Sequence, residues 1–324
     1  MKYRQVGGWG PRISVLGLGS YLTIGFKAEP EASRDMVRRA YEGGINFFDT
    51  ANRYNMGKAE EALGVYLAEF PRSSLVVLTK VYGPMGDGPN DRGLSAKHIK
   101  EQCAASLKRL NMYYVDIYMC HRPDPLTPLE ETILAMEDLV RQGKILYWGV
   151  SEWPAWMMVK AKYVARELGA RPPIVNEPRY SLLYRYPERE VFPVTRSEGI
   201  GNVVFSSLAH GMLTGKYKPG EEAPEGTRAA DPDLNRVIRR LYWTEAYKQK
   251  AQELVAISRE LGTSAANLAI AWCTLHPAVS SVILGTRTVA QLEENLAAVD
   301  VDIPADVVAV LDELFPVPGE IPSV

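Results

Sequence analysis

Four polar side chains each follow a short apolar run, and together they could move a proton. They are Asp49 after residues 46–48, Tyr54 five residues later, Lys80 after residues 75–79 and His121 after residues 115–120. Apolar runs of this length are typical of buried strands. A single polar residue at a strand end is most often structural, but four of them in succession predict a site.

The chemistry available to these residue types is proton transfer to an oxygen atom. A phenol has a pKa of about 10, so Tyr54 needs help to give up its proton at neutral pH. We expect the ammonium of Lys80 to lower the pKa of Tyr54, and Asp49 to hold that ammonium in place. His121 could donate a hydrogen bond to a carbonyl oxygen. Hydride addition to a carbonyl needs a proton donor and a hydrogen-bond donor of this kind, because the oxygen becomes negative.

The histidines do not indicate a metal site, because they are scattered without the spacing of metal ligands. They are His98, His121, His210 and His276. The hydride would then come from an organic cofactor. The run Gly17-Leu18-Gly19 does not match the dinucleotide-binding fingerprint, because the third glycine is missing. We also expect Pro30 to interrupt the chain before a helix at residues 34–42.

Eight apolar runs alternate with helical patterns, which predicts an α/β fold, a (β/α)8 TIM barrel. The expected strands cover residues 15–19, 46–48, 75–79, 115–120, 145–150, 174–176, 202–205 and 281–284. A β-hairpin within residues 3–14 precedes them. The strands of a barrel end at one rim, so the four polar residues should converge there. An open doubly wound sheet is the alternative, but it would require the missing glycine fingerprint.

The segment of residues 207–243, which follows the seventh strand, is long and rich in glycine, proline and charge. It also carries aromatic and apolar residues, so we expect it to be a loop that covers a ligand. Aromatic residues elsewhere in loops, among them Trp9 and Tyr21, suggest a pocket lined by aromatic rings.

The composition of the chain argues against several classes of protein. The chain has 324 residues and a net charge of −2, which argues against nucleic-acid or membrane-surface partners. Its three cysteines lack the spacing of zinc ligands or redox pairs. No apolar run approaches 18 residues and no apolar leader opens the chain. We therefore expect one cytoplasmic domain over residues 1–324, with reduced cysteines and no membrane insertion.

Motifs of one known family recur along the chain in the same order. They are residues 48–51 with Tyr54, residues 57–60, 92–95 and 122–125 with Thr127-Pro128, residues 147–149 with Ser151 and Trp153, Gly211 with residues 215–217, and residues 268–273. From Tyr3 to about Val299 the chain resembles the aldo-keto reductases, and in particular their branch of voltage-gated potassium channel β-subunits.

This resemblance implies NADPH-dependent reduction of small aldehydes or ketones to alcohols. Tyr54 would be the general acid, Lys80 and Asp49 would tune it, and His121 would orient the carbonyl. Channel β-subunits carry Asn at the position of His121, so this chain looks better equipped for turnover. An NADP-binding regulatory or channel-associated subunit with slow turnover is the second interpretation, and a Schiff-base aldolase using Lys80 is the third. The same branch forms rings of four subunits, which implies a homo-oligomer, a tetramer.

The resemblance also implies that NADP(H) lies in an extended pose across the barrel rim. Ser151 would contact the nicotinamide carboxamide and Tyr180 would stack on the ring. The pyrophosphate would be covered by Ser206, Leu208, Gly211, Lys216 and Arg228. The 2′-phosphate and adenine would be held by Gly285, Thr286, Arg287, Gln291, Glu294 and Asn295. A cation and backbone amides at a helix start also suit a phosphate on physical grounds.

Two carboxyl groups depart from the family pattern at the carboxamide site. Glu152 and Glu177 stand where members commonly carry Asn and Gln. A carboxylate accepts from the carboxamide NH₂ but cannot donate to its oxygen. Near the ring, negative charge would favour the oxidised, cationic cofactor. Desolvation could instead protonate one carboxyl, or both could pair outward, for example with Arg179.

Overall fold

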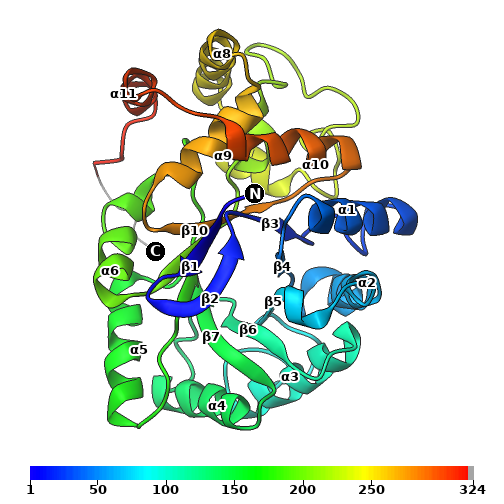
Figure 1. The fold of residues 1–324 in the computed structure, drawn as a ribbon, viewed down its shortest axis with the longest axis vertical. Helices are drawn as coiled ribbons and strands as arrows, with labels where there is room; N and C mark the ends of the chain where they lie inside the picture. The colour runs from blue at the N-terminus through cyan, green and yellow to red at the C-terminus, as the bar shows by residue number, and fades with distance from the viewer. Residues whose placement is uncertain (320–324) are drawn as a thin grey trace.

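A closed barrel of eight parallel strands forms the centre of the computed structural model, which describes residues 1–319 (Figure 1). The barrel strands are β3 Leu16–Gly19, β4 Phe47–Asp49, β5 Val76–Val81, β6 Val115–Cys120, β7 Ile145–Ser151, β8 Val175–Glu177, β9 Gly201–Val204 and β10 Val279–Leu284. Strand β10 pairs with both β9 and β3, which closes the barrel. The predicted TIM barrel is confirmed.

Helices surround the strands, as Figure 1 shows for α1 to α6. The α-helices are α1 Pro30–Glu42, α2 Lys58–Leu67, α3 Ala96–Leu110, α4 Leu129–Arg141, α5 Ala155–Glu167, α6 Val191–Glu198, α7 Arg236–Leu241, α8 Glu245–Glu260, α9 Ala265–Leu275, α10 Val289–Leu296 and α11 Ala305–Leu314. Short 3₁₀ helices are η1 Tyr54–Gly57, η2 Arg72–Ser74, η3 Tyr186–Glu188, η4 Ala209–Thr214 and η5 Ala297–Asp300. None of the helices in residues 1–319 has the length and apolar character needed to cross a membrane.

Two expectations about local structure are wrong. Pro30 does not interrupt the chain but opens α1, four residues before the expected start. Proline suits a first helical turn because its missing N–H would have no intrahelical partner there. The covering segment of residues 207–243 is not irregular throughout, since it contains η4 and α7.

The hairpin of β1 Tyr3–Val6 and β2 Trp9–Ser14 closes the end of the barrel where the strands begin. Val6 and Ile13 are fully buried in the cluster that fills the barrel interior. Arg4 donates from Nη1 to the carbonyl oxygen of Val279, the first residue of β10, at 2.7 Å. The predicted hairpin is confirmed, and the large cavity lies at the opposite rim.

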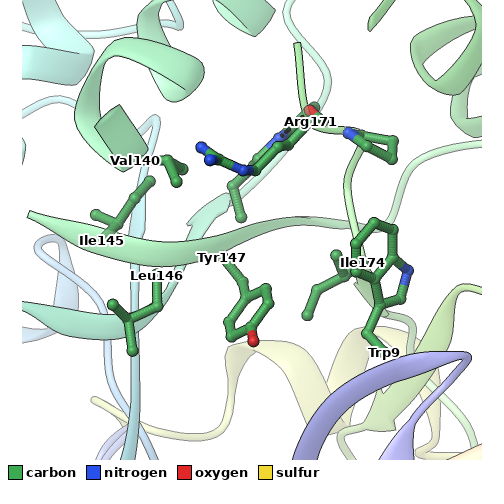
Figure 2. Close-up of a pocket in the computed structure, with 9 residues that line it drawn as sticks. Trp9, Val140, Ile145, Leu146, Tyr147, Arg171 and Ile174 are labelled. Carbon is green, nitrogen blue, oxygen red and sulfur yellow. Dashed lines mark hydrogen bonds between the residues drawn. The ribbon is translucent and has the colours of Figure 1, made fainter. Parts of the chain in front are cut away.

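A small cavity of about 320 Å³ lies at this closed end (Figure 2). Trp9 of the hairpin lines it, together with Tyr147 of β7 and Arg171. Trp9 therefore lies far along the barrel from the strand ends that carry the polar residues. The expectation that Trp9 shares a pocket with those residues is wrong.

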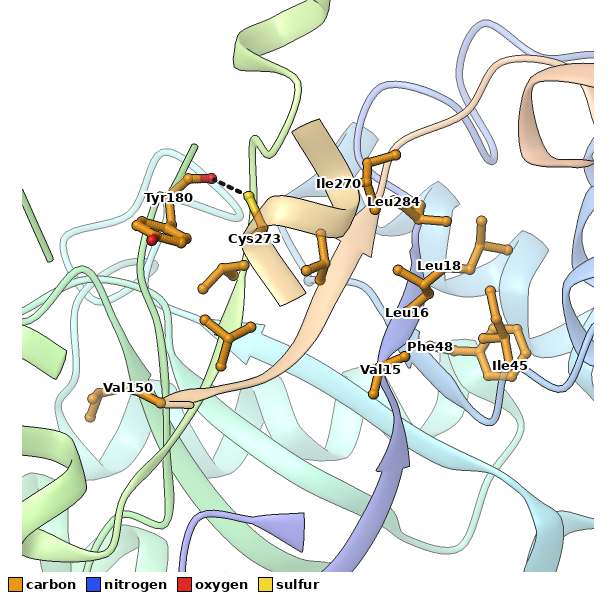
Figure 3. Close-up of a cluster of buried hydrophobic side chains, with 14 of the residues drawn as sticks. Val15, Leu16, Leu18, Ile45, Phe48, Val150, Tyr180, Ile270, Cys273 and Leu284 are labelled. Atoms are coloured by element: carbon orange, nitrogen blue, oxygen red, sulfur yellow. Dashed lines mark hydrogen bonds between the residues drawn. The ribbon is translucent and has the colours of Figure 1, made fainter. Parts of the chain in front are cut away.

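A second apolar cluster packs the outer faces of the strands against the helices. Figure 3 shows part of it, with Leu16 and Leu18 of β3 near Leu284 of β10 and Ile270 of α9. Burial of each such side chain stabilises the fold by about 1.5–3 kcal/mol. The strands are thus apolar on both faces, which explains why their sequences read as continuous apolar runs.

Candidate active site

Four barrel strands each have, at or next to their last residue, one polar residue whose side chain points into the barrel at the open rim. Side chains two residues apart in a strand point to the same face. The pairs are Phe47 with Asp49, Leu78 with Lys80, Met119 with His121 and Val175 with Glu177. The first member of each pair packs in the interior cluster. The second member therefore continues the same inward row where the apolar filling ends.

Lys80 lies at the centre of these groups and is fully buried. Its Nζ atom forms an ion pair with Oδ1 of Asp49 and donates to the carbonyl oxygen of Thr50 at 3.1 Å. It also donates to the phenol oxygen of Tyr54 at 3.2 Å. Oε2 of Glu177 lies 3.3 Å from the same nitrogen. One ammonium thus faces two carboxyls and a phenol.

The pKa of Tyr54 is raised above its ordinary value, because burial outweighs the lowering by Lys80. Asp49 and Glu177 raise it further. The predicted net lowering of this pKa is wrong, although Lys80 acts in the predicted direction. Tyr54 consequently carries its proton at neutral pH and can act as an acid.

His121 faces Tyr54 edge-on, with ring centroids 5.6 Å apart. Burial lowers the pKa of His121 well below its usual value, and the charges of Lys80 and Arg122 add to this effect. The imidazole is therefore neutral at pH 7 and keeps one N–H to donate. Arg122 donates from Nη1 to the carbonyl oxygen of His121 at 2.6 Å, which fixes this strand end.

A cavity of about 1300 Å³ opens over these groups and extends under the covering segment. Asp49, Tyr54, His121 and Tyr21 line it. The residues predicted for a cofactor that also line it are Ser151, Glu152, Glu177, Ser206, Leu208, Gly211, Lys216, Arg228, Gly285, Arg287, Gln291, Glu294 and Asn295. The fold thus brings together residues from distant parts of the chain.

Tyr180 lies elsewhere, and the prediction that it stacks on a bound ring is wrong. It is 1% exposed and packs on Trp272 of α9, with ring centroids 5.1 Å apart. Its phenol donates to Oε1 of Glu188 at 2.8 Å, and its carbonyl accepts from Cys273 (Figure 3). Phe205, directly after β9, lines the cavity instead. Its place at a strand end was the signal that could have identified it.

Thr286 also departs from its predicted place. Its side chain is 2% exposed, and Oγ1 contacts Sδ of Met36 in α1 at 3.7 Å. Its neighbours Gly285 and Arg287 do line the cavity. Successive residues after β10 face opposite sides, so Thr286 faces α1 while Gly285 and Arg287 face the cavity.

Among the cations in the cavity wall that form no ion pair within residues 1–319, three influence one another through their charges. Lys216, Arg228 and Arg287 form no ion pair with any carboxylate of residues 1–319 within 4.0 Å. Desolvation, followed by the charges of Arg228 and Arg287, lowers the pKa of Lys216. Three mutually repelling cations beside one cavity would be stabilised by an anion.

His210 was missed by the sequence reasoning. Its Nδ1 lies 3.0 Å from Nη1 of Arg228. Burial lowers the pKa of His210 to about 3, so the ring is neutral and accepts this bond. His210 therefore positions Arg228 without adding charge. No ligand-type spacing marked it in the sequence.

Left-handed backbone is concentrated around the cavity. Within residues 1–319, eight residues other than glycine have a positive φ, and six of them line the cavity. The six are Leu22, Asn55, Met56, Glu152, Ser206 and His210. Such conformations cost about 1–3 kcal/mol each and gather at ligand sites, where the surrounding structure enforces them.

Residues 15–315 match the family model described as Aldo/keto reductase family. The chain belongs to the aldo/keto reductase family. Two relatives, from Arabidopsis thaliana and from Oryza sativa subsp. japonica, are each named "Probable voltage-gated potassium channel subunit beta". Each is 41% identical over 317 residues, which covers 97% of this chain and 95% of the relative. The resemblance drawn from the motifs is confirmed, and the family assignment supports an oxidoreductase that binds a nicotinamide cofactor.

The two carboxyls that depart from the usual aldo/keto reductase pattern have different surroundings. Oε1 of Glu152 accepts from the backbone N–H of Arg179 at 2.7 Å, at the cavity rim. Glu177 is buried, and burial followed by the charge of Asp49 raises the pKa of Glu177 to about 8. Of the alternatives left open by the sequence, the raised pKa favours protonation of Glu177. Outward ion pairing of both carboxyls is wrong, because Glu152 meets the backbone of Arg179 and both carboxyls line the cavity.

Proposed function

We propose that this chain reduces aldehydes or ketones to alcohols with NADPH, through reversible hydride transfer. The observation that carries the proposal is a protonated phenol, Tyr54, held 3.2 Å from a buried ammonium in the wall of a large cavity. Family membership supports the reaction class. The phenol is the proton donor that a carbonyl oxygen needs as it becomes negative.

The cavity fits an extended dinucleotide that bears phosphates. Lys216, Arg228 and Arg287 would hold the pyrophosphate and the 2′-phosphate, since they lack acidic partners among residues 1–319. Gln291, Glu294 and Asn295, around α10, would contact the adenine. Ser151 and Phe205 would contact the nicotinamide, with Phe205 in place of Tyr180. The reduced nicotinamide supplies the hydride when it is bound.

Each member of the polar group has a separate role. Tyr54 gives its proton to the carbonyl oxygen, and the ammonium of Lys80 stabilises the tyrosinate that remains. Asp49 keeps that ammonium charged and in place. Neutral His121 donates its N–H to the same substrate oxygen, which fixes the carbonyl against the phenol.

The direct test is to incubate the protein with NADPH and a panel of aldehydes and to follow the loss of reduced-nicotinamide absorbance. Steady oxidation of NADPH with alcohol formation is the expected result. The Tyr54→Phe variant serves as the control for catalysis at this site. NADPH binding without any alcohol product from the panel would contradict the proposal.

The names of the relatives favour a second candidate, a subunit associated with a potassium channel, which we propose would also bind NADP. We propose that it would turn over slowly and would assemble as a homo-tetramer. Single-turnover rates separate the two candidates, because a regulatory subunit would retain its NADPH in the presence of an aldehyde. Rapid multiple turnover would exclude a purely regulatory role.

A further inference from the structure

The carboxyl of Glu177 lies in a buried cluster of two carboxyls and one ammonium. Glu177 is 3% exposed, and its Oε2 lies 3.3 Å from Nζ of Lys80. The same ammonium already forms an ion pair with Asp49. If both carboxyls were ionised, the buried cluster would carry a net negative charge, which desolvation disfavours. One of the two carboxyls therefore holds a proton.

Glu177 is the carboxyl that holds it. Asp49 contacts Lys80 more closely, and burial raises the pKa of Glu177 into the neutral range, to about 8. The charged and titratable groups around Glu177 are Asp49 of β4, Tyr54 of η1, Lys80 of β5, His121 and Arg122 after β6, and Glu152 after β7. Strand β9, on its other side, carries no titratable residue. At pH 7 the Asp49–Lys80 pair is thus charged and Glu177 is neutral.

Glu177 also lines the cavity beside Ser151 and Phe205, where the proposed function places the nicotinamide. That ring is neutral in the reduced cofactor and cationic in the oxidised one. A cation beside Glu177 favours its carboxylate, whereas a neutral ring leaves the protonated form in place. The charge of this carboxyl should therefore follow the redox state of the cofactor.

Lys80 connects Glu177 to the acid. Its Nζ lies 3.2 Å from the phenol of Tyr54 and 3.3 Å from Oε2 of Glu177. We propose that Glu177 is a proton store, which holds a proton beside the reduced cofactor and passes it through Lys80 to Tyr54 during reduction. This inference rests on the proposed function.

The steps balance. The O–H bond of Tyr54 breaks as a new O–H bond forms on the substrate oxygen, while the hydride goes to the carbonyl carbon. The tyrosinate takes a proton from the ammonium of Lys80, and Lys80 takes one from Glu177. Glu177 is left as a carboxylate beside a cationic ring, and a solvent proton restores it when the oxidised cofactor leaves. Overall, one carbonyl, one NADPH and one proton give one alcohol and one NADP⁺.

The equilibrium test measures proton linkage of binding and needs no turnover. NADP⁺ and NADPH are titrated calorimetrically into the wild type and Glu177→Gln from pH 6 to 9, in buffers of different ionisation heat. At pH 7 the wild type should release close to one proton with NADP⁺ and almost none with NADPH. The ratio of the NADP⁺ Kd to the NADPH Kd should fall about tenfold per pH unit below pH 8 and flatten above it. In Glu177→Gln this ratio should be independent of pH.

Glu152→Gln is the matched control, because it removes the carboxyl of the neighbouring strand end and leaves the Lys80 cluster intact. It should keep the wild-type pH slope. A pH-independent ratio in the wild type, or a full slope in Glu177→Gln, would overturn the proton store. Failure of both cofactors to bind the wild type would contradict the proposed function itself.

The relay through Lys80 has its own measurement. The NADPH complex is mixed rapidly with an aldehyde at pH 7 in the presence of a pH indicator. In the wild type, proton uptake from solvent should lag behind hydride transfer and coincide with NADP⁺ release. In Glu177→Gln, uptake should accompany hydride transfer. Uptake that accompanies hydride transfer in the wild type would overturn the relay.

Discussion

The Nζ atom of Lys80 lies 3.3 Å from Oε2 of Glu177, almost as close as the 3.2 Å that separates it from the phenol oxygen of Tyr54. Glu177, which the usual family pattern lacks, thus contacts the same ammonium of Lys80 that contacts the phenol of Tyr54. The site is consequently a coupled group of four titratable side chains, in which a change at one member alters the proton affinity of the others. The four are Asp49, Tyr54, Lys80 and Glu177.

The first prediction concerns Tyr54→Phe. We expect it to lower carbonyl reduction about 10²–10⁴-fold, because the substrate oxygen loses its proton donor. NADPH affinity should stay near the wild-type value, since the cations that would bind the phosphates are unchanged. Steady-state rates and fluorescence titration with NADPH measure the two effects. Substantial reduction by the variant would show that another group delivers the proton.

Cofactor choice is tested by Arg287→Ala. Arg287 follows β10 near the start of α10, where we place the 2′-phosphate, so its loss should weaken NADPH selectively. Removing a charge-assisted contact of this kind costs about 1.5–3 kcal/mol. Titrations with NADPH and NADH give the comparison, and Lys216→Ala is the matched control that should weaken both. Equal losses for both cofactors in Arg287→Ala would place the 2′-phosphate elsewhere.

The reassignment from Tyr180 to Phe205 predicts opposite outcomes for two aromatic residues. Phe205→Ala should weaken NADPH binding about 2- to 10-fold, because an aromatic face against the ring is lost. Tyr180→Phe should leave NADPH affinity unchanged and cost about 1.5–3 kcal/mol of stability, since a hydrogen bond to Glu188 disappears. Cofactor titration and urea unfolding measure both. Weaker NADPH binding in Tyr180→Phe alone would reverse this assignment.

The buried carboxyl of Glu177 predicts a pH dependence of stability without cofactor. Its folded-state pKa, about 8, lies above the ordinary value of 4.5, so the folded state binds more protons between these pH values. The contribution of Glu177 is therefore fully present below about pH 4.5 and is lost as pH rises towards 8. Thermal unfolding from pH 5 to 8 should show a smaller fall in Tm for Glu177→Gln than for the wild type. Identical slopes would mean that Glu177 does not titrate in this range.

Assembly is the last prediction. Since the resemblance to channel β-subunits implies a ring of four, we expect this chain to form a homo-tetramer. Light scattering at micromolar concentration should give four times the chain mass of 36.0 kDa. A monomer at that concentration would contradict the prediction.

The sequence by itself determined the barrel and the convergence of Asp49, Lys80 and His121. Each of these residues follows an apolar run, and the two-residue period of a strand sends it to the same face as a buried neighbour. The closed parallel barrel then brings the strand ends to one rim. Within strands, this geometry is regular enough for position in the chain to predict position in space.

Only the tertiary structure decided which groups beyond the strand ends face the cavity and which protons they hold. Tyr180 and Phe205 both follow strands, but the turn after β8 buries Tyr180 against Trp272 while Phe205 lines the cavity. The opposing effects of burial and of Lys80 on the pKa of Tyr54 could not be ranked from residue types. Likewise, the pKa of Glu177 is raised because strand ends that are far apart in the sequence bury its carboxyl. The ammonium beside it, Lys80, is already paired with Asp49. Desolvation and charge coupling depend on three-dimensional distances, and the order of residues along the chain does not give those distances.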